Sequence, residues 1–294
     1  MAYFKLLRPK DWAKNLFLFI PLFFAGQLEN LHKVVDLSLA FLCFSAIASS
    51  IYILNDYRDV EDDRRHPVKC KRPIASGEVS KPAALIIALA LIIAGFAGSL
   101  MIREKFTFVL AIYFVINLGY SFGLKNVSIL DIILLAAGFV LRLKAGSVVS
   151  QIALSEWIVI MVFLLALFMA IGKRRDDVLL KLESGVDMRK SVKGYNLDFL
   201  NTVLALICAV IIVAYFMYTM SERTIARLGT YRLYYTCLFV IAGLMRYLQI
   251  IFVSSDSGSP TKILYKDRFI QVTLLLWVIS FFLIIYLKRV TIFQ

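Results

Sequence analysis

The residues from Asn55 to Gly77 have the types and the spacing that metal and phosphate chemistry needs. Three acids, Asp56, Asp59 and Asp63, come first, and a dense run of arginine and lysine follows them. Acids at positions i, i+3 and i+7 lie within an arc of about 60° on one face of a helix. Carboxylates this close repel one another, and a divalent cation between them stabilises the group. The stretch therefore predicts a cation site at the end of an apolar segment.

The ligand types narrow this prediction to a magnesium site that handles phosphates. Oxygen ligands without histidine or cysteine favour Mg²⁺ over Zn²⁺, and bound Mg²⁺ usually joins a few carboxylates to substrate phosphates. The cations that follow the acids can hold the remaining phosphate oxygens. A solvated, charge-rich loop between two membrane helices is the alternative interpretation. The residues that we expect to bind substrate here are Asn55, Lys14, Arg65, Lys71 and Arg72.

The composition predicts an integral membrane protein. Of the 294 residues 61% are hydrophobic, whereas a soluble domain has about half. The net charge of +13 suits anionic lipid headgroups and anionic substrates, and we expect no nucleic-acid partner. The four cysteines form no CxxC pair, so neither a disulfide framework nor a cysteine metal site is indicated. Small residues such as Gly95 and Gly98 in an apolar segment permit a homo-oligomer.

Apolar windows of about 20 residues predict nine membrane-spanning helices and no strands. The first window is the weakest, because its apolar core is short and contains Pro21. The expected fold class is therefore all-α, a polytopic membrane protein with a single domain over residues 1–294. The nine windows are 13–30, 34–55, 83–102, 106–124, 128–149, 153–172, 199–220, 231–253 and 269–287.

The positive charges predict the orientation of these helices. With the N-terminus in the cytoplasm, 22 lysines and arginines fall on the cytoplasmic side and 8 on the other side. The two longest loops, 56–82 and 173–198, then share the cytoplasmic face. In the second loop Lys173 and Arg174 can reach phosphates, and Asp177 can add an oxygen ligand for a metal. Ordinary anchoring by positive charge is the alternative for that loop.

A few polar residues lie inside the apolar segments. Arg142 and Arg246 are candidates for binding a lipid phosphate or a ribose phosphate, because a cation within a membrane is costly and usually faces a cavity or a partner. Lys144 is better explained by a side chain that extends to the membrane surface. Asn117 and Tyr120 form a polar face on the segment 106–124 and are further candidates for substrate binding.

The order Asn55, Asp56, Asp59, Asp63 after the second apolar segment resembles the NDxxDxxxD motif of the UbiA superfamily of intramembrane prenyltransferases. Further stretches are similar to the decaprenyl-phosphate phosphoribosyltransferase branch of that superfamily. The resemblance covers most of the first six apolar segments and is thin over residues 199–294. The similar stretches are LLRPKDWAKNLFLFIPLFFAG, DRRHPVKCKRPIASG, NLGYSFGLKNVSILDIILLAAGFVLRLKAG and GKRRDD.

The second loop departs from the superfamily pattern. The usual DxxxD motif is missing between residues 173 and 198. In the phosphoribosyltransferase branch the corresponding segment resembles GKR followed by an acid, usually glutamate. Here Lys173 and Arg174 are followed by Asp177. This departure supports the branch and leaves open whether a second metal binds.

The resemblance implies a UbiA-like helical bundle with its active site at the cytoplasmic face of a bacterial-type cytoplasmic membrane. Mg²⁺ would be held by Asp56, Asp59 and Asp63. The reaction would transfer 5-phosphoribosyl from phosphoribosyl diphosphate to a polyprenyl phosphate and release diphosphate. One alternative is transfer of a prenyl group from its diphosphate to an aromatic acceptor. An alternative of another class is a lipid or small-molecule transporter.

Overall fold

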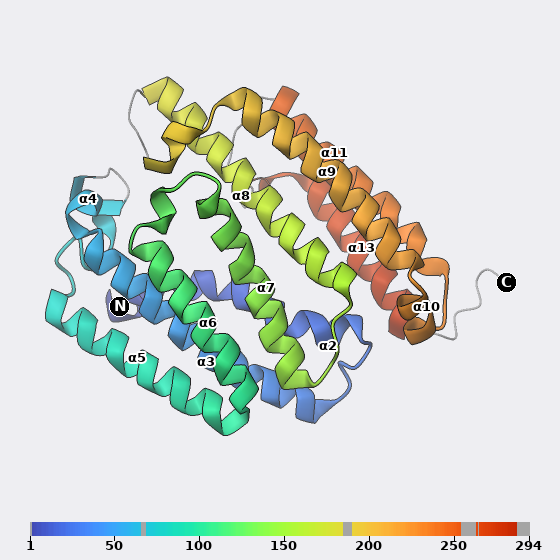
Figure 1. Ribbon diagram of the computed structural model, residues 1–294, viewed down its shortest axis with the longest axis horizontal. Helices are drawn as coiled ribbons and strands as arrows, with labels where there is room; N and C mark the ends of the chain where they lie inside the picture. Colours follow the sequence, from blue (N-terminus) through green and yellow to red (C-terminus); the bar gives the residue numbers. More distant parts are fainter. Residues whose placement is uncertain (1, 66–68, 185–189, 254–262, 264, 287–294) are drawn as a thin grey trace. The chain divides into compact units, whose positions relative to one another are not determined.

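The computed structural model describes residues 2–65, 69–184, 190–253, 263 and 265–286 (Figure 1). Over this part of the chain the structure is helical and contains no strand, which confirms the all-α fold class. The chain divides into two compact units. The first unit contains residues 1–23, 27–124 and 138–154, and the second contains 24–26, 125–137 and 155–294.

Two of the long helices before residue 126 begin at side chains that cap them. The side chain of Asn30 accepts a hydrogen bond from the backbone N–H of Lys33, and Ser80 does the same for Ala83. The elements, including the 3₁₀ helices η1 to η3, are α1 (Ala2–Leu6), η1 (Pro9–Phe19), α2 (Ile20–Phe24), α3 (Leu31–Arg58), α4 (Val60–Arg65), η2 (Lys69–Lys71), α5 (Lys81–Ile102), α6 (Glu104–Ser121) and η3 (Leu124–Asn126).

Later in the chain, two further helices begin at caps of the same kind. Asn196 accepts from the backbone N–H of Phe199, and Ser221 accepts from that of Thr224. The elements are α7 (Leu130–Ser150), α8 (Glu156–Ser184), η4 (Lys190–Gly194), α9 (Leu197–Met220), α10 (Glu222–Leu228), η5 (Arg232–Thr236), α11 (Cys237–Val253) and α13 (Arg268–Tyr286).

Seven helices in the described part of the chain are long and apolar enough to cross a membrane, fewer than the nine that we expected. The first expected span, 13–30, contains most of η1 and the short helix α2, and neither helix is long enough to be among the seven. The expected span 106–124 corresponds to α6, which is not among the seven. The seven cover residues 31–58, 81–102, 130–150, 156–182, 197–220, 232–253 and 268–285.

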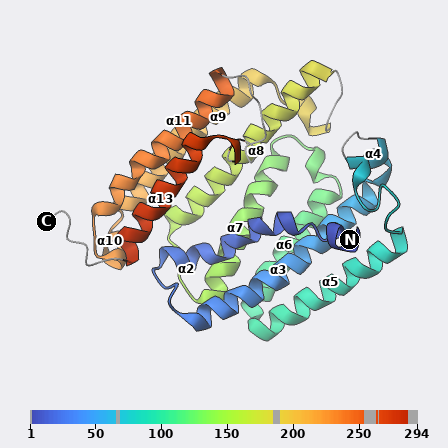
Figure 2. The ribbon, with the colours of Figure 1, turned by 180° about the vertical axis from the view of Figure 1, so that it is seen from behind.

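In the first unit, α5 packs closely along α3 (Figure 2). A Cβ atom at Gly95 would lie 2.8 Å from the side chain of Ile47, and one at Gly98 would lie 2.8 Å from the sulfur of Cys43. Both glycines thus allow a close approach of the two helices. These two glycines are therefore used for packing within the chain.

A small apolar cluster joins the N-terminal helix to the segment that carries the acids. Leu6 of α1, Ile53 of α3 and Val60 of α4 are buried together with Ile74 and Val79 of the loop before α5. Burial of side chains of this size contributes roughly 1.5–3 kcal/mol each relative to exposure. The cluster fixes the ends of α1, α3 and α4 and the loop after η2 next to one another.

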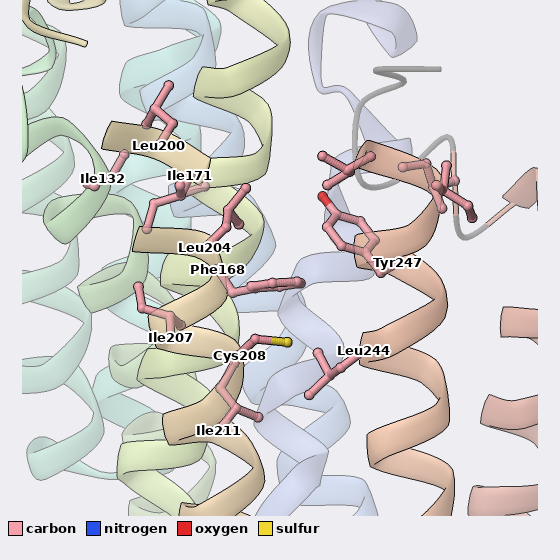
Figure 3. Close-up of a cluster of buried hydrophobic side chains, with 14 of the residues drawn as sticks. Ile132, Phe168, Ile171, Leu200, Leu204, Ile207, Cys208, Ile211, Leu244 and Tyr247 are labelled. Carbon is pink, nitrogen blue, oxygen red and sulfur yellow. The ribbon is translucent and has the colours of Figure 1, made fainter. Parts of the chain in front are cut away.

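The core of the second unit lies between α8, α9 and α11. Phe168 of α8 and Cys208 of α9 face Leu244 and Tyr247 of α11, with Leu204 on the same side of α9 (Figure 3). The rings of Phe168 and Tyr247 have centroids 4.8 Å apart. This packing holds the C-terminal helices against α8, whose far end carries the charged GKRRDD segment.

Gly146 of α7 is predicted to be essential for the position of η1. A Cβ atom at Gly146 would lie 2.0 Å from the carbonyl oxygen of Leu18, and backbone cannot give way as a flexible side chain can. Gly146→Ala should destabilise the protein by about 1–3 kcal/mol through overpacking. Gly243→Ala is the control, since its Cβ would meet only ordinary contact at 3.7 Å. Thermal unfolding in detergent measures both, and an unchanged midpoint for Gly146→Ala would contradict this account.

Candidate active site

Two buried carboxylates in the first unit point at one guanidinium. Nη1 of Arg72 lies 3.0 Å from Oδ1 of Asp56 and 2.6 Å from Oδ2 of Asp63. Both aspartates are 3% exposed, whereas the Arg72 side chain is 26% exposed. Asp56 is in the last turn of α3 and Asp63 is in α4, so the break between these helices brings the two acids together.

Asp59 lies at the junction between the two helices. It is the C-cap of α3, with φ −88° and ψ 10°, and its N–H donates to the carbonyl of Asn55. The N–H of Asp63 donates in turn to the carbonyl of Asp59 at 2.8 Å, so the helical hydrogen-bond spacing continues across the junction. The side-chain amide of Asn55 donates to Oδ2 of Asp59 at 3.2 Å. Helical hydrogen bonding thus runs from Asn55 through Asp59 to Asp63 across the junction.

Sequence reasoning missed a second arginine at this cluster, Arg8. Its Nη2 lies 2.5 Å and 2.6 Å from the two carboxylate oxygens of Asp56. The guanidinium also lies over the ring of Tyr52, 5.2 Å from its centroid. Arg8 has φ 52° and ψ 57°, a left-handed conformation that costs free energy in a residue with a Cβ. The only sequence signal was its place before Pro9 in the LLRPKDW stretch.

Ser49 of α3 holds the N-terminal segment in position for Arg8. The indole N–H of Trp12 donates to the Ser49 hydroxyl at 3.0 Å, and that hydroxyl donates to the carbonyl of Leu7 at 2.7 Å. Lys14 lies on the same side, where it donates to Asp11 at 2.6 Å and lies 5.9 Å from the centroid of Tyr52. The N-terminal segment therefore brings two cations to the end of α3.

The donor atoms of this cluster fit a hard divalent cation. Within the described residues, no group of three histidine, cysteine, aspartate or glutamate side chains is already arranged to hold a metal. Two carboxylates do converge on one point, with a third acid one turn away, and all the donor atoms are oxygens. Mg²⁺ keeps several of its waters and needs only one or two carboxylates from the protein. The residues therefore fit Mg²⁺ once Arg72 has left the point where the carboxylates meet.

The other substrate-binding candidates of the first unit have varied surroundings. Lys71 is exposed in η2, next to Arg72. Arg65 ends α4, and its side chain lies outside the described residues. The amide of Asn117 donates to the carbonyl of Tyr113 in its own helix, and Tyr120 is partly exposed one turn further on.

Arg142 is enclosed by neutral groups, and our expectation that it binds a phosphate is not supported by its surroundings. Its side chain donates to Asn15 Oδ1 at 2.8 Å, to the Gly138 carbonyl at 2.9 Å and to the Tyr113 hydroxyl at 2.7 Å. Its guanidinium also lies within 5.4 Å of the ring centroids of Phe44, Tyr113 and Phe139. Arg142 is 5% exposed and thus serves to tie η1 to α6 and α7.

In the second unit Arg174 belongs to a buried ion pair. Its Nε lies 2.6 Å from Asp131, which is fully buried, and its Nη1 lies 2.8 Å from Asp177. The Tyr195 hydroxyl donates to Asp131 at 2.7 Å, and burial together with this hydrogen bond raises the pKa of Tyr195 above its ordinary value. Lys173, by contrast, is exposed. Arg174 thus holds α7 and α8 together, and Lys173 is the cation of this segment that solvent reaches.

Arg246 joins two helices of the second unit. It donates to Oδ2 of Asp267 from Nε at 3.1 Å and from Nη2 at 2.8 Å. The hydrogen bond from Arg246 holds the pKa of Asp267 below its ordinary value. Asp267 also accepts from the backbone N–H of Ile270 and so caps α13. Lys144 is exposed, as expected for a side chain that extends to the membrane surface.

The comparisons with known proteins agree with the helical fold and the acid pattern. The model of the UbiA prenyltransferase family matches residues 16–262. The chain belongs to the UbiA prenyltransferase family. Membership in this family and the seven apolar helices make it an integral membrane protein.

Curated relatives match the chain over nearly its whole length. A decaprenyl-phosphate phosphoribosyltransferase from Corynebacterium glutamicum is 34% identical over 289 residues, which are 96% of this chain and 86% of the relative. One of the same name from Mycolicibacterium smegmatis is 34% identical over 93% of this chain and 89% of the relative. A solved UbiA homologue from Archaeoglobus fulgidus, bound to GPP and Mg²⁺, has a TM-score of 0.70 and 21% identity, over 97% of this chain and 99% of that one. This structure shows that the fold is shared.

Arg8→Gln should loosen the N-terminal segment of this UbiA-family protein. The substitution removes a hydrogen bond to a charged partner, worth about 1.5–3 kcal/mol, while the Ser49 contacts stay intact. Hydrogen exchange of peptides covering residues 2–14 should become faster than in the wild type. Lys10→Gln, at an exposed position in the same segment, is the matched control. Equal exchange in the two variants would mean that Ser49 and the apolar cluster hold the segment without Arg8.

Proposed function

We propose that this protein transfers 5-phosphoribosyl from phosphoribosyl diphosphate to a polyprenyl phosphate and releases diphosphate in a Mg²⁺-dependent reaction. The observation that carries the proposal is the 34% identity to decaprenyl-phosphate phosphoribosyltransferases over nearly the whole of both chains. The cluster of Asp56 and Asp63 with Arg8 and Arg72 adds the chemistry that such a donor needs. The proposal treats residues 1–294 as one catalytic domain, since α7 contributes residues to both units.

In this proposal Asp56, Asp59 and Asp63 hold Mg²⁺. Bound Mg²⁺ would neutralise the diphosphate as it leaves and so lower the barrier to cleavage of the bond between ribose C1 and oxygen. Arg72 contacts two of these acids and exposed Lys71 precedes it in the chain, and both would bind diphosphate oxygens. The electron pair of the broken bond leaves with the diphosphate, and the ribose passes through an oxocarbenium-like transition state.

The acceptor requires little from the protein beyond orientation. A phosphate monoester is already largely ionised near neutral pH, so one of its oxygens can form the new bond to C1 without a general base. Lys14 and Lys173 are exposed cations that suit the acceptor phosphate or the 5-phosphate of the donor. The polyprenyl chain would remain in the bilayer, which suits a reaction at the membrane surface.

The proposed orientation places these residues on the cytoplasmic side of a bacterial-type cytoplasmic membrane. The segments on that side contain more lysine and arginine than the segments on the other side, which supports a cytoplasmic N-terminus. Phosphoribosyl diphosphate is a water-soluble anion of the cytoplasm, so the donor would reach the site from that side.

A second candidate is transfer of a prenyl group from prenyl diphosphate to an aromatic acceptor. The solved relative from Archaeoglobus fulgidus binds GPP and Mg²⁺, and a diphosphate leaving group would use the same carboxylates. We would expect an enzyme for this reaction to have the second acidic motif, DxxxD, which is missing from the 173–198 loop. We therefore prefer the phosphoribosyl donor.

A transfer assay in detergent with Mg²⁺ tests the proposal. One reaction receives labelled phosphoribosyl diphosphate and a polyprenyl phosphate, and the other receives a prenyl diphosphate and 4-hydroxybenzoate. We expect label in the lipid phase of the first reaction only, and its loss with EDTA. Asp63→Asn should lower this activity at least about a hundredfold, as the loss of an electrostatic group at a reacting centre does. Asp62→Asn, at the exposed neighbouring position, should leave it nearly unchanged. Product in the second reaction alone would contradict the proposal.

A further inference from the structure

The place where Asp56 and Asp63 converge is held by a cation that belongs to the protein. Nη1 of Arg72 lies within 3.0 Å of an oxygen from each carboxylate. A divalent ion that used both oxygens would need the same place, and it could not share it with a guanidinium at contact distance. Binding of the metal and the present position of Arg72 therefore exclude each other.

The charges of the cluster are already balanced without a metal. Arg8 lies against Asp56, and Arg72 bridges Asp56 and Asp63, so two guanidinium groups face two buried carboxylates. A bare divalent ion would have to break the contacts of Arg72 and would leave that cation beside a second positive charge. A metal that arrives together with diphosphate brings the negative oxygens that Arg72 can bind instead. The cost of displacing Arg72 is therefore offset only when the metal arrives together with diphosphate.

The structure allows Arg72 to move while its backbone stays fixed. The backbone N–H of Arg72 donates to the carbonyl of Lys69, and the Arg72 carbonyl accepts from Ser76. The residues that follow are anchored by burial of Ile74 and by a hydrogen bond from the Val79 N–H to Pro73. The side chain itself is 26% exposed. A change of side-chain torsions is enough to carry the guanidinium from the carboxylates to a neighbouring ligand.

Arg8 is similarly exposed, at 24%, and differs from Arg72 in its contacts. It contacts Asp56 alone and lies over the ring of Tyr52. Its segment is tied to α3 through Ser49. Arg8 thus remains on Asp56 as a fixed counter-charge, and Arg72 is the cation that can exchange.

We propose that Arg72 makes this site selective for a metal–diphosphate complex over the bare metal ion. Arg72 competes with the metal for Asp56 and Asp63 until diphosphate supplies it with another partner. This inference rests on the proposed function for the location of the metal–diphosphate site, and it adds the coupling of the two ligands through one side chain.

The experiment measures metal binding without catalysis. Purified protein in detergent is titrated with Mn²⁺, with and without inorganic diphosphate, and free Mn²⁺ is followed by electron paramagnetic resonance. The variants are Arg72→Gln and Arg72→Lys. Lys71→Gln on the same loop is the control for the binding of Mn²⁺ alone, since Lys71 is itself proposed to bind diphosphate. Mn²⁺ serves as the probe because it accepts the same oxygen ligands as Mg²⁺.

We expect the Arg72→Gln variant to change the two affinities in opposite directions. Mn²⁺ alone should bind at least about fivefold more tightly to this variant than to the wild type. The increase in Mn²⁺ affinity that diphosphate causes should be about tenfold smaller in the variant, which is within the usual range of coupling between sites. Lys71→Gln should not tighten binding of Mn²⁺ alone, because in the described part of the chain Arg72, and not Lys71, forms the ion pairs of that loop with Asp56 and Asp63. The Mn²⁺ affinities of Arg72→Lys should lie between those of the wild type and of Arg72→Gln, since lysine keeps the positive charge but lacks the planar guanidinium.

Three results would overturn the inference. The first is Arg72→Gln protein that binds Mn²⁺ alone no more tightly than the wild type. The second is wild-type protein whose Mn²⁺ affinity does not depend on diphosphate. The third applies if Arg72→Gln fails to fold, and it is a folded Arg72→Lys variant that keeps the full wild-type gain from diphosphate. The Mn²⁺ titration contains neither organic substrate. Its outcome therefore does not depend on whether the transfer assay above detects phosphoribosyl transfer.

Discussion

Two carboxylates buried at the end of a membrane helix set the main constraint on this structure. A buried charge is costly unless cations or hydrogen bonds compensate it. The chain meets this need for Asp56 and Asp63 with arginines from two different segments, Arg8 and Arg72. The N-terminal segment and the loop before α5 must therefore dock on the end of α3. The apolar cluster around Leu6, Ile53 and Ile74 and the Ser49 hydrogen bonds hold them there.

The arginines of this protein serve different ends, and their surroundings separate them. Arg142 and Arg174 are almost fully buried and complete their hydrogen bonds within the chain, so they hold helices together. Arg246 is partly exposed and joins α11 to the start of α13 through Asp267. Arg72 is partly exposed and contacts two acids at once. Partial exposure beside a carboxylate pair thus distinguishes a cation that can meet a ligand from one that supports the fold.

The sequence predicted the all-α membrane fold and family membership, because long apolar windows and the NDxxDxxxD spacing are local signals. Of the nine expected spans, seven correspond to helices of the described residues that are long and apolar enough to cross a membrane, and the run around Asn15 and Pro21 forms a 3₁₀ helix and a short α-helix. The sequence could not distinguish Arg142 from Arg72. Both are cations near polar residues in the sequence, and only the tertiary contacts with Asn15 and Tyr113 show that Arg142 is enclosed. Arg8 was missed because its partner is 48 residues away.

The most direct test of the account is a structure of the protein with Mn²⁺ and phosphoribosyl diphosphate, in which anomalous scattering locates the metal. The account predicts a metal coordinated by oxygens of Asp56 and Asp63 at a distance of about 2.1–2.2 Å, close to the value for Mg²⁺. It also predicts that Arg72 has moved from the carboxylates to a diphosphate oxygen while Arg8 remains on Asp56. A bound donor with Arg72 still between Asp56 and Asp63, and with the metal elsewhere, would contradict it.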